Sequence, residues 1–401
     1  MSSRLLAGAA LGLASVGMAL ARAGVEAPAL RGTVGPALLA PAPFPGSLPT
    51  LPWPQRGEAA VAVDGVGVLG ASPRQRPLPI ASLTKLMTAL VVLRDHPLRP
   101  GQRGPVLVIT TADRAVYLAE RAANDSTLAV RAGERISEHQ LLEGLLIPSG
   151  DNAAGILARW DAGSLAAFVA RMNATAATFG LRHTRYGDAS GLAPSSASSA
   201  VDQTHLAEVA LRNPVVRGIV RLAHVRLPVA GWVDNPDPLA GRPFVIGLKT
   251  GWTAVAGGCL ILAVRRAEAG EPVTVVATAL GQRGPAQLPR AAAVSQRLAR
   301  IALSLVRRRR VALTRPVGRL ATSWGAGVPL LAVGSVDLLG WPGLPVTIRV
   351  RLDRTLPALP IPAGTRLGTA LVTAGAQSLP LPVVTARRLL APSPPWWLRA
   401  S

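Results

Sequence analysis

The spacing of apolar residues predicts a mixture of helices and strands up to about residue 306. Alternating positions around Asp64-Gly65, a common turn pair, predict a β-hairpin over residues 59–69. Longer apolar runs predict helices over residues 82–93, 138–147, 152–160, 164–179, 201–212 and 288–306. Shorter apolar runs predict strands over residues 106–111, 244–248, 259–265 and 273–280.

The pattern changes after Arg310. Helical spacing disappears, and short apolar stretches recur between turns over residues 317–321, 327–333, 346–352, 365–373 and 377–385. Such a series is typical of a small all-β domain, which we expect over residues 311–390. Residues 57–306 are long enough for a larger domain that mixes helices and strands.

The two ends of the chain differ from these domains. Residues 1–23 combine a positive start, an apolar stretch and Ala21-Arg22-Ala23, which favours a cleaved export signal over an uncleaved membrane anchor. Residues 24–56 are rich in Pro, Gly and Ala without a period, so a flexible linker is expected. The tail, residues 391–401, contains Trp396-Trp397, which predicts either a membrane-interface contact or a frayed end.

Composition adds information about partners. The formal net charge of +22 favours an anionic neighbour such as a membrane surface or an anionic wall polymer. Nucleic acid is not expected, because no aromatic platform accompanies the arginines and the chain carries an export signal. Cys259 is the only cysteine, which excludes an internal disulfide and argues against a structural zinc site. No metal or organic cofactor is expected.

Lysine is almost absent from this basic chain. Of the 43 Lys and Arg residues, only Lys85 and Lys249 are lysine. An arginine cannot release its proton in a protein, whereas a buried lysine can. The two lysines are therefore candidates for chemical roles.

Ser82-Leu83-Thr84-Lys85 opens the first predicted helix. Positions three apart lie on one helix face, so the Lys85 amine can reach the Ser82 hydroxyl. A serine nucleophile needs a base, and a buried lysine with a lowered pKa can act as one. This spacing alone is common on surface helices, but the apolar helix here would bury Lys85.

Two further motifs follow in the chain. Ser149-Gly150-Asp151-Asn152 lies between two predicted helices, where such residues also serve as ordinary caps and turns. Lys249-Thr250-Gly251 is expected at the end of a strand, where a peptide could align along the strand edge. Either motif alone is weak, but the order S-x-x-K, S-x-[DN], K-T-G is the set shared by penicillin-binding proteins and class A β-lactamases.

With these motifs the chain resembles the D-alanyl-D-alanine carboxypeptidases among low-molecular-weight penicillin-binding proteins. Supporting stretches are Pro79-Ile80-Ala81, Met87-Thr88-Ala89-Leu90, residues 168–177 and Ser190-Gly191-Leu192. The resemblance implies an α/β (α+β) β-lactamase/transpeptidase-like domain, with a mostly antiparallel sheet flanked by helices and followed by a small β-sandwich. It also implies removal of the terminal D-alanine from peptidoglycan stem peptides outside the cytoplasm, with β-lactams as covalent inhibitors.

The resemblance assigns a role to each motif residue. Ser82 is the acylated nucleophile, Lys85 its general base and Ser149 a proton shuttle. Lys249, Thr250 and Gly251 bind the substrate carboxylate and backbone. The main-chain N–H groups of Ser82 and Trp252 form an oxyanion hole, and Arg283 assists in binding the carboxylate.

Asp151 departs from the family pattern, which has asparagine at this substrate-binding position. An ionised aspartate cannot donate a hydrogen bond to a substrate carbonyl, and it favours the charged form of a neighbouring lysine. Using Asn152 instead would turn the side chain by about a quarter turn on a helix. Asp151 therefore affects the expected rate rather than the type of reaction.

Several alternatives stay open at this level. A serine β-lactamase shares the motifs but needs a carboxylate for deacylation, and residues 186–199 offer only Asp188. A non-catalytic wall-binding or sensor protein on the same fold is favoured by Asp151 alone. Carboxypeptidase, endopeptidase and weak transpeptidase activities are not distinguished by the sequence.

Overall fold

The computed structural model describes residues 30–34 and 42–391, which divide into two units. The larger unit spans residues 48–306. The smaller unit contains residues 307–391 together with the described residues that precede position 48. The predicted export signal and the tail from residue 392 onward lie outside the described residues, and within those residues no helix is both long and apolar enough to cross a membrane.

The larger unit is built on a five-stranded antiparallel sheet of order β10-β11-β12-β2-β3. Its strands are β2 (Glu58–Val63), β3 (Gly67–Ala71), β10 (Val245–Thr253), β11 (Gly257–Glu268) and β12 (Glu271–Gln282). The predicted hairpin around Asp64-Gly65 is confirmed as the β2–β3 pair. Since β10 is at the edge of the sheet, one side of its backbone is not paired with another strand of this sheet.

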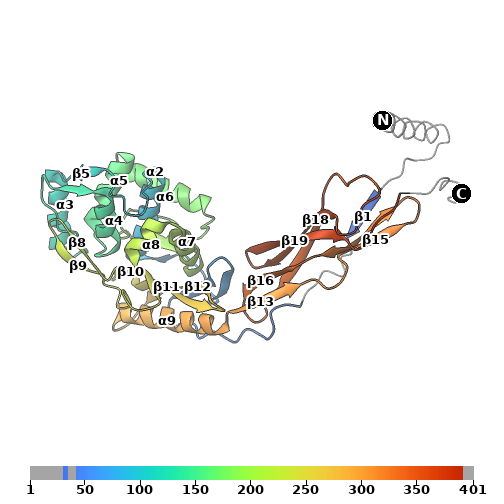
Figure 1. The fold of residues 1–401 in the computed structure, drawn as a ribbon. Helices are drawn as coiled ribbons and strands as arrows, with labels where there is room; N and C mark the ends of the chain where they lie inside the picture. Colours follow the sequence, from blue (N-terminus) through green and yellow to red (C-terminus); the bar gives the residue numbers. More distant parts are fainter. Residues whose placement is uncertain (1–29, 35–41, 392–401) are drawn as a thin grey trace, which may run out of the picture. The chain divides into compact units, whose positions relative to one another are not determined.

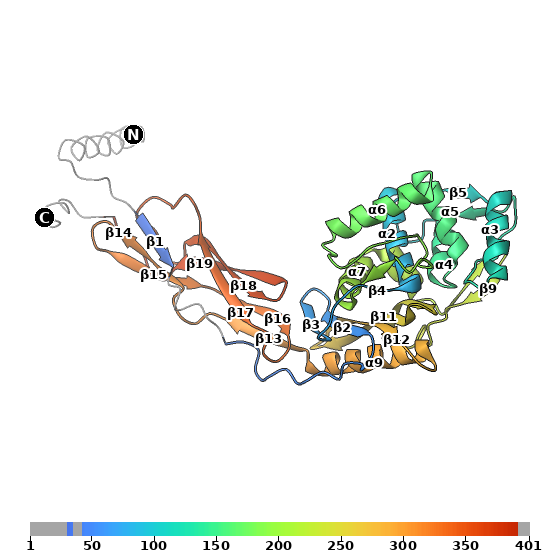
Figure 2. The ribbon, with the colours of Figure 1, turned by 180° about the vertical axis from the view of Figure 1, so that it is seen from behind.

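Helices cover both faces of this sheet. Helix α9 (Gln287–Leu305) packs along one face, as its amphipathic spacing predicts, and the other helices lie on the opposite side (Figures 1 and 2). This group consists of α2 (Thr84–Asp95), α3 (Thr111–Ala122), α4 (Glu138–Leu146), α5 (Asp151–Ala162), α6 (Leu165–Thr178), α7 (Ala200–Arg212) and α8 (Pro214–Val220). The expected α/β class with a mostly antiparallel sheet flanked by helices is confirmed.

Helix α2 is in the middle of the core. All residues from Thr84 to Leu93 are buried, and they pack against α4, α5, α6 and α7. A one-turn 3-10 helix, Ala81–Leu83, leads directly into α2. The apolar run that predicted this helix therefore carries Lys85 into the interior.

Short strand pairs connect these elements: β4 (Leu78–Pro79) with β7 (Ala197–Ser198), β5 (Val106–Val108) with β6 (Arg135–Ser137), and β8 (His224–Leu227) with β9 (Gly231–Asp234). The predicted capping box of α4 is confirmed, since Ser137 and Gln140 exchange side-chain and backbone hydrogen bonds.

Some local predictions were wrong or incomplete. The Lys249-Thr250-Gly251 motif lies inside β10 rather than at a strand end, because pairing with β11 continues to Thr253. Helix α3 and helix α8 were not predicted. For α3 a signal was present, since Thr110 and Asp113 form a capping box at its start.

The smaller unit is entirely β. Its sheets have the orders β1-β14-β15-β19-β18-β17 and β13-β16, and β16 packs against β18 and β19. The strands after the larger unit are β13 (Arg307–Ala312), β14 (Gly318–Thr322), β15 (Gly327–Ala332), β16 (Ser335–Gly340), β17 (Val346–Leu352), β18 (Arg366–Ala374) and β19 (Gln377–Thr385).

The expectation of a flexible linker over residues 24–56 was wrong for part of that segment. Strand β1 (Leu30–Val34) pairs antiparallel with β14 in the smaller unit. Phe44 is buried in the same unit, and its backbone N–H donates to the carbonyl of Leu344. Backbone pairing and a single buried aromatic ring order these residues, and neither leaves a periodic signal in a Pro- and Gly-rich sequence.

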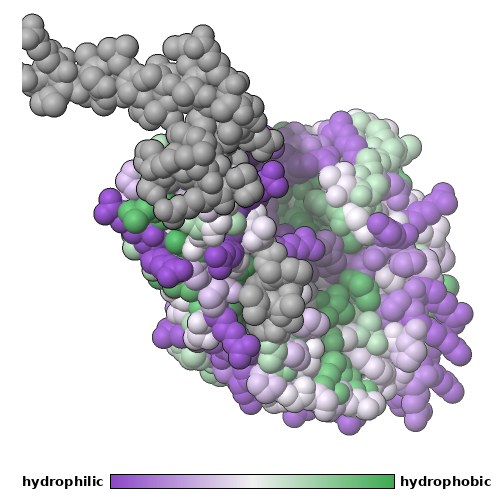
Figure 3. All heavy atoms as spheres, turned by 90° about the vertical axis from the view of Figure 1, so that its right-hand side faces the viewer, coloured by the Kyte–Doolittle hydropathy of each residue, from purple (hydrophilic) through white to green (hydrophobic). Residues whose placement is uncertain are grey.

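The face of the molecule seen in Figure 3 carries hydrophilic and apolar residues interspersed with one another.

Candidate active site

Lys85 is completely buried at the start of α2 and is surrounded by three acceptors. Its Nζ donates to Ser82 Oγ at 2.7 Å, to Asp151 Oδ1 at 2.6 Å and to the Ser190 carbonyl at 2.9 Å. An ammonium group has three N–H donors, so this set satisfies its charged form completely. The predicted contact between Ser82 and Lys85 is thus present in the structure.

Ser82 lies on the 3-10 turn before α2, where the backbone is held tightly. Ala81, just before it, has a left-handed backbone with φ of 49°, a conformation that costs free energy for a residue with a side chain. Gly191 approaches the Ala81 carbonyl so closely that an added Cβ would lie 1.9 Å from that oxygen. A loop glycine and a strained turn therefore fix the hydroxyl of Ser82 beside Lys85.

Asp151, and not Asn152, faces the lysine. Asp151 is the first residue of α5 and forms a buried ion pair with Lys85. Burial raises the pKa of Asp151, and the charge of Lys85 opposes this increase. The Asn152 side chain instead exchanges two hydrogen bonds of 2.8 Å with the backbone of Leu128, so it is committed to holding a neighbouring loop.

Ser149 is buried next to this cluster in sequence but has no hydrogen-bond partner for its Oγ among the described residues. Its backbone is left-handed, with φ of 65°. Its hydroxyl is not hydrogen-bonded to Ser82 or to Lys85. A buried hydroxyl without a partner is unfavourable, so a substrate group that bonds to it would gain free energy.

Lys249 is a second buried amine near the first. Its Nζ donates to the Thr250 carbonyl at 3.1 Å, and only 2 % of the residue is exposed. Burial, followed by the charge of Lys85, lowers the pKa of Lys249 to about 7. The two lysines singled out by the sequence therefore belong to one electrostatic site.

Edge strand β10 brings its motif against the nucleophile. A Cβ added to Gly251 would lie 2.9 Å from the Ile80 carbonyl and 3.1 Å from the Ser82 nitrogen, so glycine is needed for this approach. Thr250 is buried beside it, whereas the Trp252 side chain is half exposed and donates from Nε1 to Gln287. Arg283 donates to the carbonyls of Ala254 and Val255, so its guanidinium is occupied within the turn after β10.

Asp188 organises the loop that carries Ser190. It accepts hydrogen bonds from the backbone N–H groups of residues 191–193 and from the hydroxyls of Ser190 and Ser196. A carboxylate occupied in this way is not free to activate water. The β-lactamase interpretation, which needs such a carboxylate in this loop, therefore gains no support from Asp188.

Two parts of the site were missed in the sequence. The Ser190 carbonyl accepts from Lys85, a backbone role that no side-chain motif reveals. Glu120, on the unpredicted helix α3, is half-buried, and burial together with the charges of Asp151 and Asp125 raises its pKa to about 7. Within the described part of the chain, no group of His, Cys, Asp and Glu is arranged to hold a metal ion.

The model of the family described as D-alanyl-D-alanine carboxypeptidase matches residues 54–281, which contain all three motifs. The chain belongs to this family. Family membership makes it a serine peptidase of the penicillin-binding type.

Curated relatives of the family agree with the match. The chain is 32% identical over 240 residues to a D-alanyl-D-alanine endopeptidase of Pseudomonas aeruginosa, covering 57% of this chain and 74% of the relative. It is also 32% identical over 228 residues to the D-alanyl-D-alanine carboxypeptidase DacB2 of Mycobacterium tuberculosis, covering 55% of this chain and 74% of the relative.

Solved structures of similar fold include a penicillin binding protein and a DD-transpeptidase. Penicillin binding protein 5 from Haemophilus influenzae superposes with a TM-score of 0.62 at 19% identity, covering 85% of this chain and 99% of that one. The Streptomyces K15 DD-transpeptidase gives a TM-score of 0.56 at 25% identity, covering 64% of this chain and all of that one.

Replacing Asp151 by asparagine tests the effect of the family departure. In Asp151→Asn the amide keeps the shape, removes the buried ion pair with Lys85 and can donate a hydrogen bond to a substrate carbonyl, which a carboxylate cannot. We expect acylation by benzylpenicillin at pH 7 to become about tenfold faster, since one added hydrogen bond of about 1.4 kcal/mol corresponds to tenfold. Mass spectrometry of samples quenched at successive times measures the rate at which the adduct forms.

The control is Asp234→Asn, which removes the same charge from an exposed position on β9. It should acylate at the wild-type rate. A slower Asp151→Asn enzyme would show that the carboxylate assists Lys85 rather than restraining it.

Proposed function

We propose that this chain is an exported serine D-Ala-D-Ala carboxypeptidase that removes the terminal D-alanine of peptidoglycan stem peptides. The contact of 2.7 Å between Lys85 Nζ and Ser82 Oγ, next to edge strand β10, carries the proposal. The site combines a serine nucleophile with a base. It also offers a strand edge to which the backbone of a peptide substrate can hydrogen-bond as an additional strand.

Acylation begins with neutral Lys85. The Nζ lone pair takes the proton of Ser82, and Oγ attacks the carbonyl carbon between the two D-alanines. The tetrahedral oxyanion is stabilised by main-chain N–H groups of Ser82 and Trp252. The C–N bond then breaks, and the peptide remains as an ester on Ser82.

Ser149 completes the proton path. Its buried hydroxyl, which lacks a partner among the described residues, donates a proton to the leaving amine of D-alanine and recovers one from protonated Lys85. Water then attacks the ester with Lys85 again as base, which releases the shortened peptide and restores Ser82. A β-lactam forms the same ester but keeps its leaving group attached, so it inhibits covalently.

Lys249 and Thr250 bind the carboxylate of the terminal D-alanine. The Lys249 ammonium and the Thr250 hydroxyl both belong to β10, the strand that aligns the peptide backbone. One strand therefore both aligns the peptide and binds its terminal carboxylate.

The larger unit, residues 48–306 rather than the predicted 57–306, is then the catalytic domain. The β domain, which begins with β13 at Arg307 rather than at the predicted residue 311, is an accessory domain. Export by residues 1–23 places the enzyme outside the cytoplasm, where its substrate is. The cationic surface and the tail at 391–401 would hold it near the membrane or wall.

Release of D-alanine from a pentapeptide stem tests the proposed reaction directly. Mass spectrometry after incubation should show the loss of one alanine with the wild-type chain. Ser82→Ala should lower the rate by at least about 10³-fold, because the nucleophile is absent. Cleavage of a cross-linked dimer without any shortening of the pentapeptide would contradict the carboxypeptidase assignment.

The role of Lys249 predicts a pH dependence of binding. Because its pKa is lowered to about 7, Lys249 is charged below that pH and becomes neutral above it. In the Ser82→Ala background, affinity for an acyl-D-Ala-D-Ala peptide should fall about tenfold between pH 6 and pH 8, since tenfold corresponds to one pH unit beyond the pKa.

Lys249→Arg in the same background is the matched variant, because a guanidinium keeps its proton throughout this range. Its affinity, measured by calorimetry, should stay constant with pH. An equal loss of affinity with rising pH in both proteins would show that Lys249 does not bind the carboxylate.

A further inference from the structure

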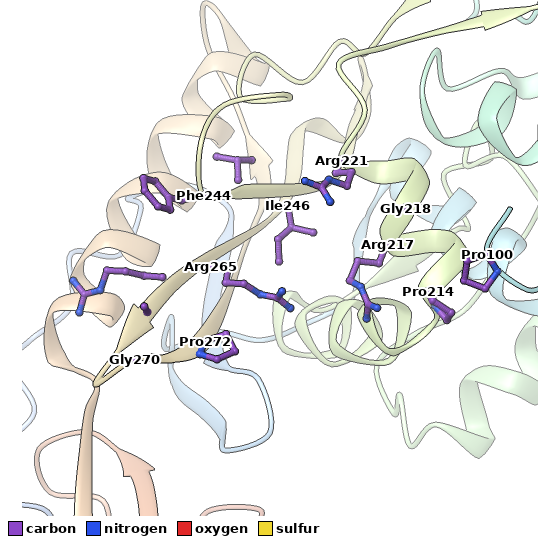
Figure 4. A pocket seen from close by; sticks show the side chains of 13 residues that line it. Pro100, Pro214, Arg217, Gly218, Arg221, Phe244, Ile246, Arg265, Gly270 and Pro272 are labelled. Carbon is purple, nitrogen blue, oxygen red and sulfur yellow. The ribbon is translucent and has the colours of Figure 1, made fainter.

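A pocket of about 640 Å³ lies at the opposite end of β10 from the nucleophile (Figure 4). From Val245 in its lining to Gly251 beside Ser82, the strand rises about 20 Å. Four of the lining residues are arginines, Arg217, Arg221, Arg265 and Arg266, and no lining residue is acidic. The pocket is therefore separate from the catalytic site and strongly cationic.

The fold assembles these arginines from separate elements. Arg217 lies on α8, Arg221 follows its end, and Arg265 and Arg266 lie on β11. Helix α8 can approach β10 because Gly247 has no side chain, and an added Cβ there would lie 2.3 Å from the Val220 carbonyl. In Figure 4 the side chains of Arg217, Arg221 and Arg265 extend into the space between α8 and the two strands.

Most of this charge is not neutralised within the described part of the chain. Arg266 pairs with Glu268 at 3.1 Å. Among the described residues, no carboxylate forms an ion pair with Arg217, Arg221 or Arg265. The charge of Arg265 acts on the partly buried Asp64, whose pKa is nevertheless raised, mainly by burial. Arg217 donates one hydrogen bond to the Leu211 carbonyl, which leaves other guanidinium N–H groups available.

The apolar wall of the pocket contains an unusual aromatic residue. Phe244 is 75% exposed and has a left-handed backbone with φ of 68°. Both features cost free energy, and strained residues of this kind are concentrated at functional sites. An exposed ring next to the arginines gives the pocket an apolar contact surface for the part of a ligand that carries the anion.

We propose that this pocket binds a phosphate ester group of an anionic cell-envelope component. Guanidinium groups form paired hydrogen bonds with phosphate oxygens, and convergence of several of them in a recess favours a compact phosphate anion over a dispersed charge. Binding there would retain the enzyme at an anionic layer while leaving the cleft at Ser82 open to the peptide. The proposal does not depend on the reaction at Ser82.

Calorimetric titration of the full chain with inorganic pyrophosphate tests the site. Arg221→Gln/Arg265→Gln should weaken binding at least tenfold relative to wild type. Within the described ranges, the Arg221 side chain has no hydrogen bond and that of Arg265 has one long contact of 3.4 Å to Thr274, so the variant should fold and keep its peptidase rate. An unchanged melting temperature shows that the fold is intact.

The matched control is Arg182→Gln/Arg297→Gln, which removes the same charge from two exposed positions elsewhere in the larger unit. It should bind pyrophosphate as the wild type does. Equal weakening in both double variants, or no binding by the wild type at millimolar pyrophosphate, would overturn the proposal.

Vesicle sedimentation distinguishes two sources of the phosphate group. If the pocket variant alone loses binding to phosphatidylglycerol vesicles, with phosphatidylcholine vesicles as the blank, the ligand is a lipid headgroup. If it loses pyrophosphate but sediments with these vesicles as the wild type does, the ligand is a phosphate ester of a soluble or wall-bound polymer. Both results support a phosphate site.

Discussion

The burial of one ammonium group constrains the whole catalytic centre. A charged amine in a protein interior must be surrounded by acceptors, because unpaired burial costs several kcal/mol. Lys85 obtains its three acceptors from three separate segments: the turn before α2, the start of α5 and the loop at Ser190. The three hydrogen bonds of Lys85 thereby position the nucleophile, the second motif and the Ser190 loop relative to one another.

The same constraint explains the electrostatics of the site. Burial lowers the pKa of Lys249 to about 7, and repulsion from the charge of Lys85 contributes to this decrease. Asp151 offsets part of this repulsion, although burial also raises its own pKa. Asparagine at this position would remove the buried ion pair with Lys85, so the aspartate stabilises the resting arrangement of the site.

Much of the larger unit could be predicted from the sequence because its signals are local. The capping box at Ser137, the hairpin at Asp64-Gly65 and the buried run of α2 each appear in consecutive residues. Lys85 and Lys249 were singled out by residue type, since lysine is rare in an arginine-rich chain, and the other site residues were predicted from motifs. Contacts that depend on backbone or distant pairing, such as the Ser190 carbonyl and strand β1, left no local pattern to detect. The arginine pocket was not predicted either, because its residues come together only in the folded chain.

The account depends most on the pairing of Ser82 with Lys85, and mapping of a penicillin adduct tests it most directly. After incubation with benzylpenicillin and proteolysis, mass spectrometry should place the adduct on the peptide containing Ser82. The adduct should be absent in Lys85→Arg, because a guanidinium cannot accept the serine proton. An adduct on another residue, or equal acylation of the folded Lys85→Arg variant, would contradict the account.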